Sequence, residues 1–131
     1  MATEVLTVQV RIKEALEVKG GINGVTMILF DGECECDNFK GKILPGGVDT
    51  QRLGEDGRVK LSARYIMEGV DYTGKSCRIF IENNGEIQSD GRIVTSPCIL
   101  TDSDALKHLE TAALTGTVEG APDGVVIHIF A

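Results

Sequence analysis

Two cysteines and a cluster of acids open the stretch ECECDNFKGKILPGGVD, residues 33–49. Cys34 and Cys36 could bind a metal, form a redox pair, or pack as small apolar side chains. Zinc sites usually combine cysteines that have two to four residues between them with nearby histidines. Only one residue separates Cys34 from Cys36, and His108 and His128 lie far along the chain. The spacing therefore favours reduced, packed thiols and no metal site.

The Pro-Gly-Gly turn at the far end of this stretch is the second candidate for chemistry. Pro45 fixes its own φ, while Gly46 and Gly47 accept backbone angles that other residues resist. Such a turn is typical of a corner or bulge that closes a barrel. It could also let a ligand approach the backbone, in which case Asp49 would point into the mouth of a cavity. Asp49 could equally cap nearby backbone N–H groups.

A predicted hairpin carries the next polar side chains. If its turn is centred near residues 72–73, Tyr65 lies opposite Phe80 and Arg64 lies opposite Ile81. A slip of one residue would exchange these partners. Either way each face mixes apolar bulk with one or two polar groups, which is typical of a lumen that holds a small ligand.

Arg64 is the most informative of these side chains. Inside a barrel its guanidinium would bind a carboxylate or enolate oxygen bidentately. On the surface it would form a structural ion pair with Glu68, Glu82 or Asp49. If it lies inside, acid–base chemistry by Asp49, with Arg64, Tyr65 and Asn83 as electrostatic partners, becomes feasible.

Short alternating strands separated by glycine-rich turns would position these residues. Leu6, Val8, Val10 and Ile12 share one face of the first strand, and residues 124–131 form a closing strand that is apolar on both faces. The pattern predicts one domain, residues 1–131, with about eight to nine antiparallel strands. Closure into a barrel would protect the apolar last strand from becoming an open edge.

One segment breaks the strand pattern. Apolar residues that include Leu106 and Leu109 recur at helical spacing, which predicts a short helix near residues 103–113. His108 falls off the apolar stripe and is expected to face solvent. The helix could cover or plug one end of the barrel.

The composition excludes several classes of protein. The net charge of −7 repels phosphate backbones, and aromatic residues at 5% with no Trp do not provide a stacking platform, so no nucleic acid is expected as partner. The longest apolar run, residues 25–30, is too short to span a bilayer. The N-terminal residues alternate and carry charges, unlike a signal peptide, so we expect a cytoplasmic protein without membrane contact.

Five segments together resemble the domain-of-unknown-function family three-two-three-seven. They are GKILPGGVDTQ (41–51), DGRVKLSARYIMEG (56–69), RIFIENNGE (78–86), SPCILTDSDALKHLE (96–110) and PDGVVIHIF (122–130). The resemblance implies a small antiparallel β-barrel of the calycin or allene-oxide-cyclase-like kind, often oligomeric, and no particular function. Members often carry Trp at the position of Thr50 and in the segment that holds His108 and Leu109, so a ligand pocket here would be reshaped.

These observations predict a β-barrel that binds a small organic molecule, with an organic anion as one candidate. The predicted ligand-binding residues are Asp49, Arg64, Tyr65, Asn83, Gly46 and Gly47. One alternative is a cofactor-independent isomerase, cyclase or lyase that acts on a small carbonyl compound, and another is an oligomeric interaction module without ligand. We expect no cofactor, and we expect the protein to form a homo-oligomer.

Overall fold

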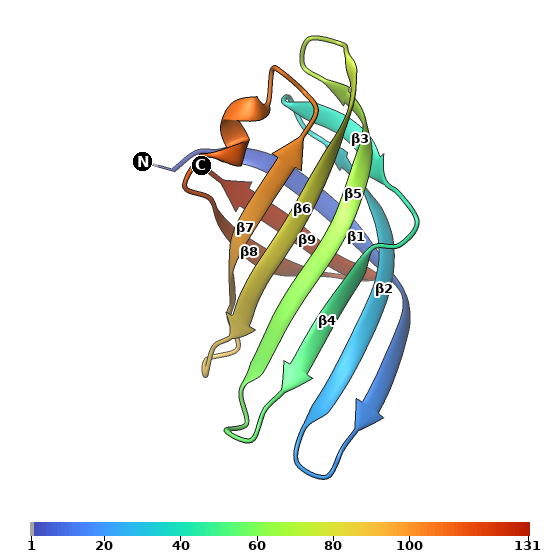
Figure 1. Ribbon diagram of the computed structural model, residues 1–131, viewed down its shortest axis with the longest axis vertical. Coiled ribbons are helices and arrows are strands. Elements are labelled where there is room, and N and C mark those ends of the chain that lie inside the picture. The colour runs from blue at the N-terminus through green and yellow to red at the C-terminus, as the bar shows by residue number, and fades with distance from the viewer. Residues whose placement is uncertain (1) are drawn as a thin grey trace.

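The computed structural model describes residues 2–131, which form strands almost throughout (Figure 1). The strands are β1 (Glu4–Lys19), β2 (Gly24–Glu35), β3 (Phe39–Ile43), β4 (Val48–Leu53), β5 (Val59–Asp71), β6 (Ser76–Ile87), β7 (Ile93–Thr101), β8 (Thr115–Ala121) and β9 (Gly124–Phe130). A 3₁₀ helix, η1 (Lys107–Glu110), is the one helix among the described residues. None of these residues belongs to a helix with the length and hydrophobicity that a membrane crossing requires.

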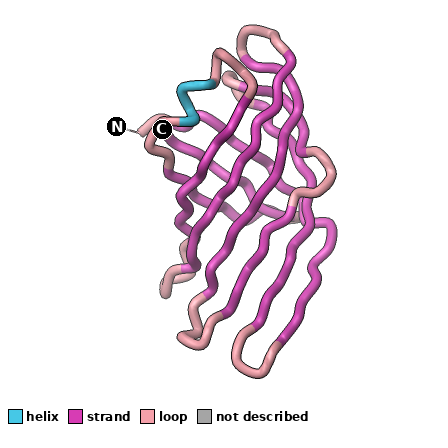
Figure 2. The backbone as a smooth tube through the Cα atoms, in the orientation of Figure 1, coloured by secondary structure: helices cyan, strands magenta, loops and turns pink. Residues whose placement is uncertain are grey.

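The nine strands form one antiparallel sheet that closes on itself (Figure 2). Strands β1, β9, β8, β7, β6 and β5 follow one another around the ring. Strands β3 and β4 both lie between β5 and β2 at different heights, and β1 pairs with β2 to complete the circle. The predicted all-β barrel is confirmed, and β9 lies between β1 and β8, where neither of its edges is open.

Three hairpins share one loop geometry, with three loop residues of which the third is glycine at positive φ. These glycines are Gly57 (φ 78°), Gly74 (φ 86°) and Gly91 (φ 86°). In the β5–β6 hairpin the Asp71 N–H donates to the Lys75 carbonyl at 3.0 Å, and the Gly74 N–H donates to the Asp71 carbonyl at 2.9 Å. A type I turn followed by a left-handed glycine is a common three-residue hairpin connection, and it fixes the register of the two strands.

That loop corrects the predicted register of β5 and β6. An odd number of loop residues centres the hairpin on Thr73, so Tyr65 pairs with Ile81 and Arg64 pairs with Glu82. Each pairing lies one residue away from the prediction. Because side chains alternate between faces, this single step changes which residues of β6 share a face with each residue of β5.

A β-bulge interrupts β1 at Lys13. Ile12 pairs with Phe30 and Glu14 pairs with Leu29, so Lys13 is an extra residue with no partner of its own on β2. An extra residue in one strand reverses which face its later side chains occupy.

The reversal sends the apolar residues of β1 to two different places. Leu6, Val8 and Val10 point into the barrel and are buried, as predicted, whereas Ile12, beside the bulge, is 49% exposed. Beyond the bulge Leu16 and Val18 lie outside, with 52% and 67% of their surface exposed. The apolar alternation of β1 therefore serves the core first and the outer surface afterwards.

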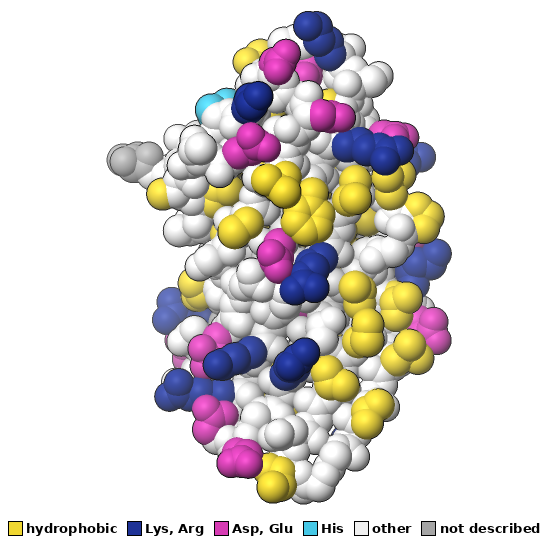
Figure 3. Space-filling view, in the orientation of Figure 1, with side chains coloured by type: hydrophobic (Ala, Val, Ile, Leu, Met, Phe, Trp, Pro, Cys, Tyr) yellow, Lys and Arg dark blue, Asp and Glu magenta, His cyan; other side chains and the backbone are white. Residues whose placement is uncertain are grey.

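The exposed part of β1 joins apolar side chains of β2 and β4 in an outer apolar strip. The strip consists of Leu16, Val18, Val25, Met27, Leu29 and Val48, and register pairs them as Leu16 with Met27, Val18 with Val25 and Leu29 with Val48. Figure 3 shows hydrophobic side chains gathered on this side of the molecule, at the lower right.

The predicted helix at residues 103–113 is reduced to η1. Before it, the Ser103 hydroxyl donates to Asp71 Oδ2 at 2.7 Å and accepts the Leu106 N–H at 3.2 Å. Such side-chain hydrogen bonds compete with a regular helix. Leu106 and Leu109 are nevertheless buried, each 1% exposed, and pack into the core at the end of the barrel drawn uppermost in Figure 1.

The two ends of the barrel are filled differently. Large side chains occupy the upper half, where Phe39, Met67, Ile79 and Ile81 are almost fully buried. Each such side chain stabilises the fold by about 1.5–3 kcal/mol relative to exposure. The lower half, near the β4–β5 and β6–β7 turns, is where the lumen stays open.

Candidate ligand-binding site

A cavity of about 150 Å³ occupies the lower half of the lumen. Its walls come from every strand except β3, and ten of its thirteen lining side chains are apolar. The three polar ones are Asp49, Gln51 and Asn83. An apolar space with a few polar anchors is typical of a small-molecule site, and this one is smaller than the ~300–1,000 Å³ of drug-sized pockets.

Asp49 and Asn83 lie in one cross-strand row on the inner face. Asp49 on β4 pairs with Ala63 on β5, which pairs with Asn83 on β6. Two inter-strand steps separate the Asp49 and Asn83 backbones by about 10 Å. Because the Ala63 side chain is a single methyl group, it leaves space between the two polar groups.

The carboxylate of Asp49 is half satisfied. Its Oδ2 accepts a hydrogen bond from Gln51 Nε2 at 3.0 Å, while its Oδ1 is buried without a hydrogen-bond partner. Loss of hydration raises the pKa of Asp49, and hydrogen bonding from the Gln51 side chain and the Ser62 backbone opposes that shift. Oδ1 of Asp49 therefore lacks a well-placed donor, in surroundings that disfavour the charge of the carboxylate.

Two more buried oxygen atoms lack hydrogen-bond partners near this row. They are Oδ1 of Asn83 and the hydroxyl oxygen of Tyr65, and both residues are 2% exposed. Burial is the main cause that raises the pKa of Tyr65, and its ring packs edge-on against Phe30 with centroids 5.4 Å apart. A buried polar atom without a partner costs about 1–3 kcal/mol, so each of these atoms would be stabilised by a hydrogen-bond partner.

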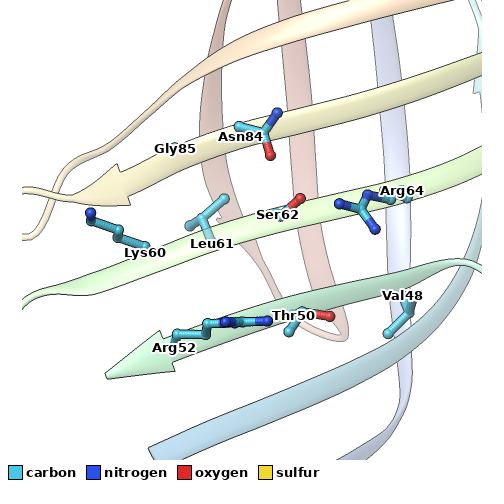
Figure 4. Close-up of a pocket in the computed structure, with 9 residues that line it drawn as sticks. All are labelled: Val48, Thr50, Arg52, Lys60, Leu61, Ser62, Arg64, Asn84 and Gly85. Atoms are coloured by element: carbon cyan, nitrogen blue, oxygen red, sulfur yellow. The ribbon is translucent and has the colours of Figure 1, made fainter. Parts of the chain in front are cut away.

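Arg64 does not join this group. Its side chain lies on the outer face, and Arg64 Nε is 3.0 Å from Glu82 Oε2. Figure 4 shows it beside Thr50 and Ser62 in a groove on the outer face of the barrel. The corrected β5–β6 register is the physical reason, because it places Tyr65 inside and its neighbour outside.

The two glycines of the turn support the site without lining it. Gly46 is exposed with φ 111°, and a Cβ atom there would meet nothing within 4 Å. Gly47 is buried, and a Cβ atom on it would lie 3.1 Å from the Phe30 ring. The Phe30 N–H donates to the Gly47 carbonyl at 3.1 Å. The turn thereby brings β4 back onto β2 and points Asp49 inward.

Gln51 and Thr95 are inward polar residues that the sequence reasoning missed. Gln51 lies two residues after Asp49 on the same strand, so alternation alone would have placed both on one face. Thr95 Oγ1 is buried without a partner. Thr95 pairs with Gly85 and Gly116, and no local signal in the sequence distinguishes it from other strand threonines.

The cysteine pair lies apart from the cavity, toward the upper end. The Sγ atoms of Cys34 and Cys36 are 3.6 Å apart, and all four cysteines are free thiols. The hydrogen bond with Cys34 is the main cause that lowers the pKa of Cys36 to about 6, and the same bond together with burial raises the pKa of Cys34. Among residues 2–131 no group of three or more His, Cys, Asp or Glu side chains is arranged to hold a metal ion.

A closed nine-stranded barrel with a small, mostly apolar lumenal cavity defines the class of this protein. Within that class the chain belongs to the family described as protein of unknown function (DUF3237), whose model matches residues 2–131. The resemblance noted from the sequence is thereby confirmed. A UPF0311 protein of Clostridium acetobutylicum is 44% identical over 57 residues, a segment that covers 44% of this chain and 34% of that relative.

Solved structures share the fold at low sequence identity. A protein of unknown function from Clostridium acetobutylicum has a TM-score of 0.83 at 24% identity. The match covers 99% of this chain and 97% of that protein. A conserved protein of unknown function from Rhodopseudomonas palustris has a TM-score of 0.83 at 20% identity, with coverage of 99% and 95%. A β-barrel-like protein from Acinetobacter baumannii has a TM-score of 0.82 at 15% identity, with coverage of 99% and 94%.

Proposed function

We propose that the barrel binds a small, mostly apolar organic molecule that carries a hydrogen-bond donor. The observation that supports this is the buried Oδ1 of Asp49, which lacks a partner on the wall of an otherwise apolar cavity. A hydroxyl or amine group of the ligand would donate to this oxygen. The apolar body of the ligand would contact residues such as Ile28 and Ile127.

An organic anion is not proposed for this cavity. Neither Lys nor Arg is among the described residues that line it, and Arg64 lies on the outer face. A second negative charge beside Asp49 would meet repulsion in surroundings of low polarity. A neutral ligand, or one with a positive charge, fits the lining better.

A panel of three similar compounds tests the binding proposal. They are p-cresol, toluene and 4-methylbenzoate, which share a tolyl body and differ in carrying a donor, no polar group or a charge. We expect p-cresol to raise the melting temperature most, because its hydroxyl group can donate to Oδ1 of Asp49. A ligand at about 100 times its Kd adds about 2.7 kcal/mol of stability. An equal effect of toluene and p-cresol would remove Asp49 from the proposal.

Variants make the same test specific for Asp49. Asp49→Leu keeps the branching at Cγ and removes the acceptor, so the p-cresol shift should fall to the toluene value. The control is Asp104→Leu at an exposed carboxylate, which should respond to p-cresol as the unmodified protein does. A p-cresol shift that persists in Asp49→Leu would contradict the proposal.

A second candidate function is proton transfer to or from a small carbonyl compound, as in a cofactor-independent isomerase, cyclase or lyase. The raised pKa of Asp49 supports this candidate, because a carboxylate in an apolar site is a stronger base than one in water. An enzyme from Penicillium herquei has the same fold with a TM-score of 0.79 at 14% identity, covering 99% of this chain and 92% of its own. Exchange of the α-protons of cyclohexanone in D₂O, followed by NMR and lost in Asp49→Asn, is the test.

Association of copies is proposed for the outer apolar strip. Exposed apolar side chains that form one patch often mark a protein interface. Leu16, Val18 and Met27 are 52%, 67% and 41% exposed, and together with their paired neighbours they form such a patch. A cytoplasmic homo-oligomer with a ligand in each barrel is the form that we propose.

A further inference from the structure

A groove of about 410 Å³ lies on the outer face of the barrel over β4, β5 and β6 (Figure 4). Its floor is the row Thr50, Ser62 and Asn84, which are cross-strand partners on three adjacent strands. These side chains are short, whereas longer basic side chains flank them on the same face. The groove is therefore a consequence of residue size along one row of the sheet.

Two guanidinium groups approach this floor from opposite sides. Arg52 follows Thr50 by two residues on β4, and Arg64 follows Ser62 by two residues on β5. Because the strands are antiparallel, the two arginines lie on opposite sides of the floor row. Figure 4 shows both side chains extending toward Thr50 and Ser62, while the ammonium group of Lys60 turns away.

Several hydrogen-bond donors in the groove are free to donate to a ligand. The Ser62 hydroxyl is buried without a hydrogen-bond partner. The Arg64 ion pair with Glu82 uses Nε and is exposed, with 63% of the Arg64 side chain accessible. Exposed ion pairs contribute only about 0–1 kcal/mol, so this contact can be replaced or shared. Within residues 2–131, Arg52 forms no ion pair at 4.0 Å or less.

We infer that this groove binds the phosphoryl group of a small soluble ligand. Arg52 and Arg64 would grip the group from opposite sides, and the hydroxyls of Thr50 and Ser62 would donate from the floor. A single bidentate arginine satisfies a planar carboxylate. Donors from three directions match a tetrahedral group with three or more acceptor oxygens.

The charge of the whole chain limits the size of this ligand. A net charge of −7 repels an extended polyanion such as nucleic acid, and Glu82 and Glu86 lie on the neighbouring strand β6. A single phosphoryl group contacts only the local cluster of positive charge. The groove shares no polar residue with the lumenal cavity, so this inference is independent of the ligand binding proposed above for the lumen.

The experiment is an NMR titration of the whole protein with inorganic phosphate, with sodium chloride adjusted to hold the ionic strength constant. We expect saturable shifts of the Arg52 and Arg64 Nε–H signals and of the Ser62 and Asn84 amides. Arg52→Gln and Arg64→Gln should each weaken binding at least about tenfold, which corresponds to about 1.4 kcal/mol. Arg92→Gln is the control, because Arg92 lies in the β6–β7 turn and pairs with Asp90.

Other outcomes overturn the inference. Shifts that grow linearly without saturation, or that appear equally in Arg92 and in chloride alone, would show screening of surface charge only. Saturable binding that survives in both Arg52→Gln and Arg64→Gln would place phosphate elsewhere. Arg52→Lys keeps the charge and loses the planar fork, so it should bind more weakly than the unmodified protein and gives a second reading if Arg52→Gln does not fold.

Discussion

Asp49 and Arg64 lie on opposite faces of one strand pair, the first in the lumenal cavity and the second in the outer groove. On the β4–β5 ladder Asp49 pairs with Ala63, and the next residue of β5 is Arg64. Adjacent residues of a regular strand point to opposite sides. The acidic and the basic side chain that sequence reasoning would bring into one cavity therefore serve two separate surfaces.

Asp49→Asn should stabilise the protein at neutral pH and not at acidic pH. Burial raises the pKa of Asp49 in the folded state above its ordinary value of 3.8. Stability linked to a raised pKa is fully present below the unfolded pKa and is lost as pH rises through the folded pKa. Urea unfolding should show a gain for the variant at about pH 7 that disappears at about pH 3.

Asp104→Asn is the control for that comparison, since its carboxylate is exposed. It should change stability little at either pH. A loss of stability in Asp49→Asn at neutral pH would mean that the folded state favours the negative charge of Asp49, which contradicts a raised pKa.

Ala63→Val should fill part of the lumenal cavity. The two added carbon atoms would gain about 0.8 kcal/mol each from burial if they fit without strain, and valine suits a strand. The space between Asp49 and Asn83 would close at the same time. Calorimetry should show a higher melting temperature and a reduced response to p-cresol, whereas Ala113→Val at an exposed position should leave the p-cresol response unchanged.

Cys36 should react with iodoacetamide faster than Cys98 near neutral pH, although Cys98 is the more exposed. The hydrogen bond from Cys34 lowers the pKa of Cys36 to about 6, so its thiolate dominates at about pH 7. Peptide mass spectrometry measures the rates. Cys34→Ala should slow the reaction of Cys36, whereas Cys34→Ser keeps an O–H donor and should slow it less. Faster labelling of Cys98 would refute the assignment.

Met27→Glu should dissociate an assembly built on the outer apolar strip. Met27 pairs with Leu16 on β1 and lies between Val25 and Leu29 on the outer face of β2, so a carboxylate there would be buried among apolar groups in an interface that covers the strip. Light scattering should report a smaller mass for the variant than for the unmodified protein. Leu100→Glu, on the outer face of β7, is the control. Dissociation by Leu100→Glu alone would move the interface to the other side of the barrel.

Much of the fold follows from the sequence, because alternation and glycine turns are local signals. Alternation places Leu6 and Val8 correctly in the core, and the apolar last strand correctly predicts a closed all-β sheet. The predicted β5–β6 register is wrong by one residue. The signal that corrects it is the glycine at the third loop position, Gly74, which recurs at Gly57 and Gly91.

The site is harder to predict, because it depends on the exact register of neighbouring strands. Asp49 and Asn83 belong to one cavity, and Tyr65 is buried beside it. Arg64 lies outside. The predicted register, which is wrong by one residue, would have put it on the same face as Asn83. The bulge at Lys13 has no local signal, since neither glycine nor proline marks it, and only the pairing of both flanks with β2 reveals it.

The Lys13 bulge changes which face of β1 the even-numbered residues occupy. The apolar residues of β1 from Leu6 to Val18 all carry even numbers except Ala15, so the alternation in the sequence does not reveal this change. One inserted residue nevertheless divides this uniform series into an inner half and an outer half. Regular alternation in the sequence thus supplies both core residues and exposed apolar residues, and deletion of Lys13 would turn Leu16 and Val18 toward the lumen.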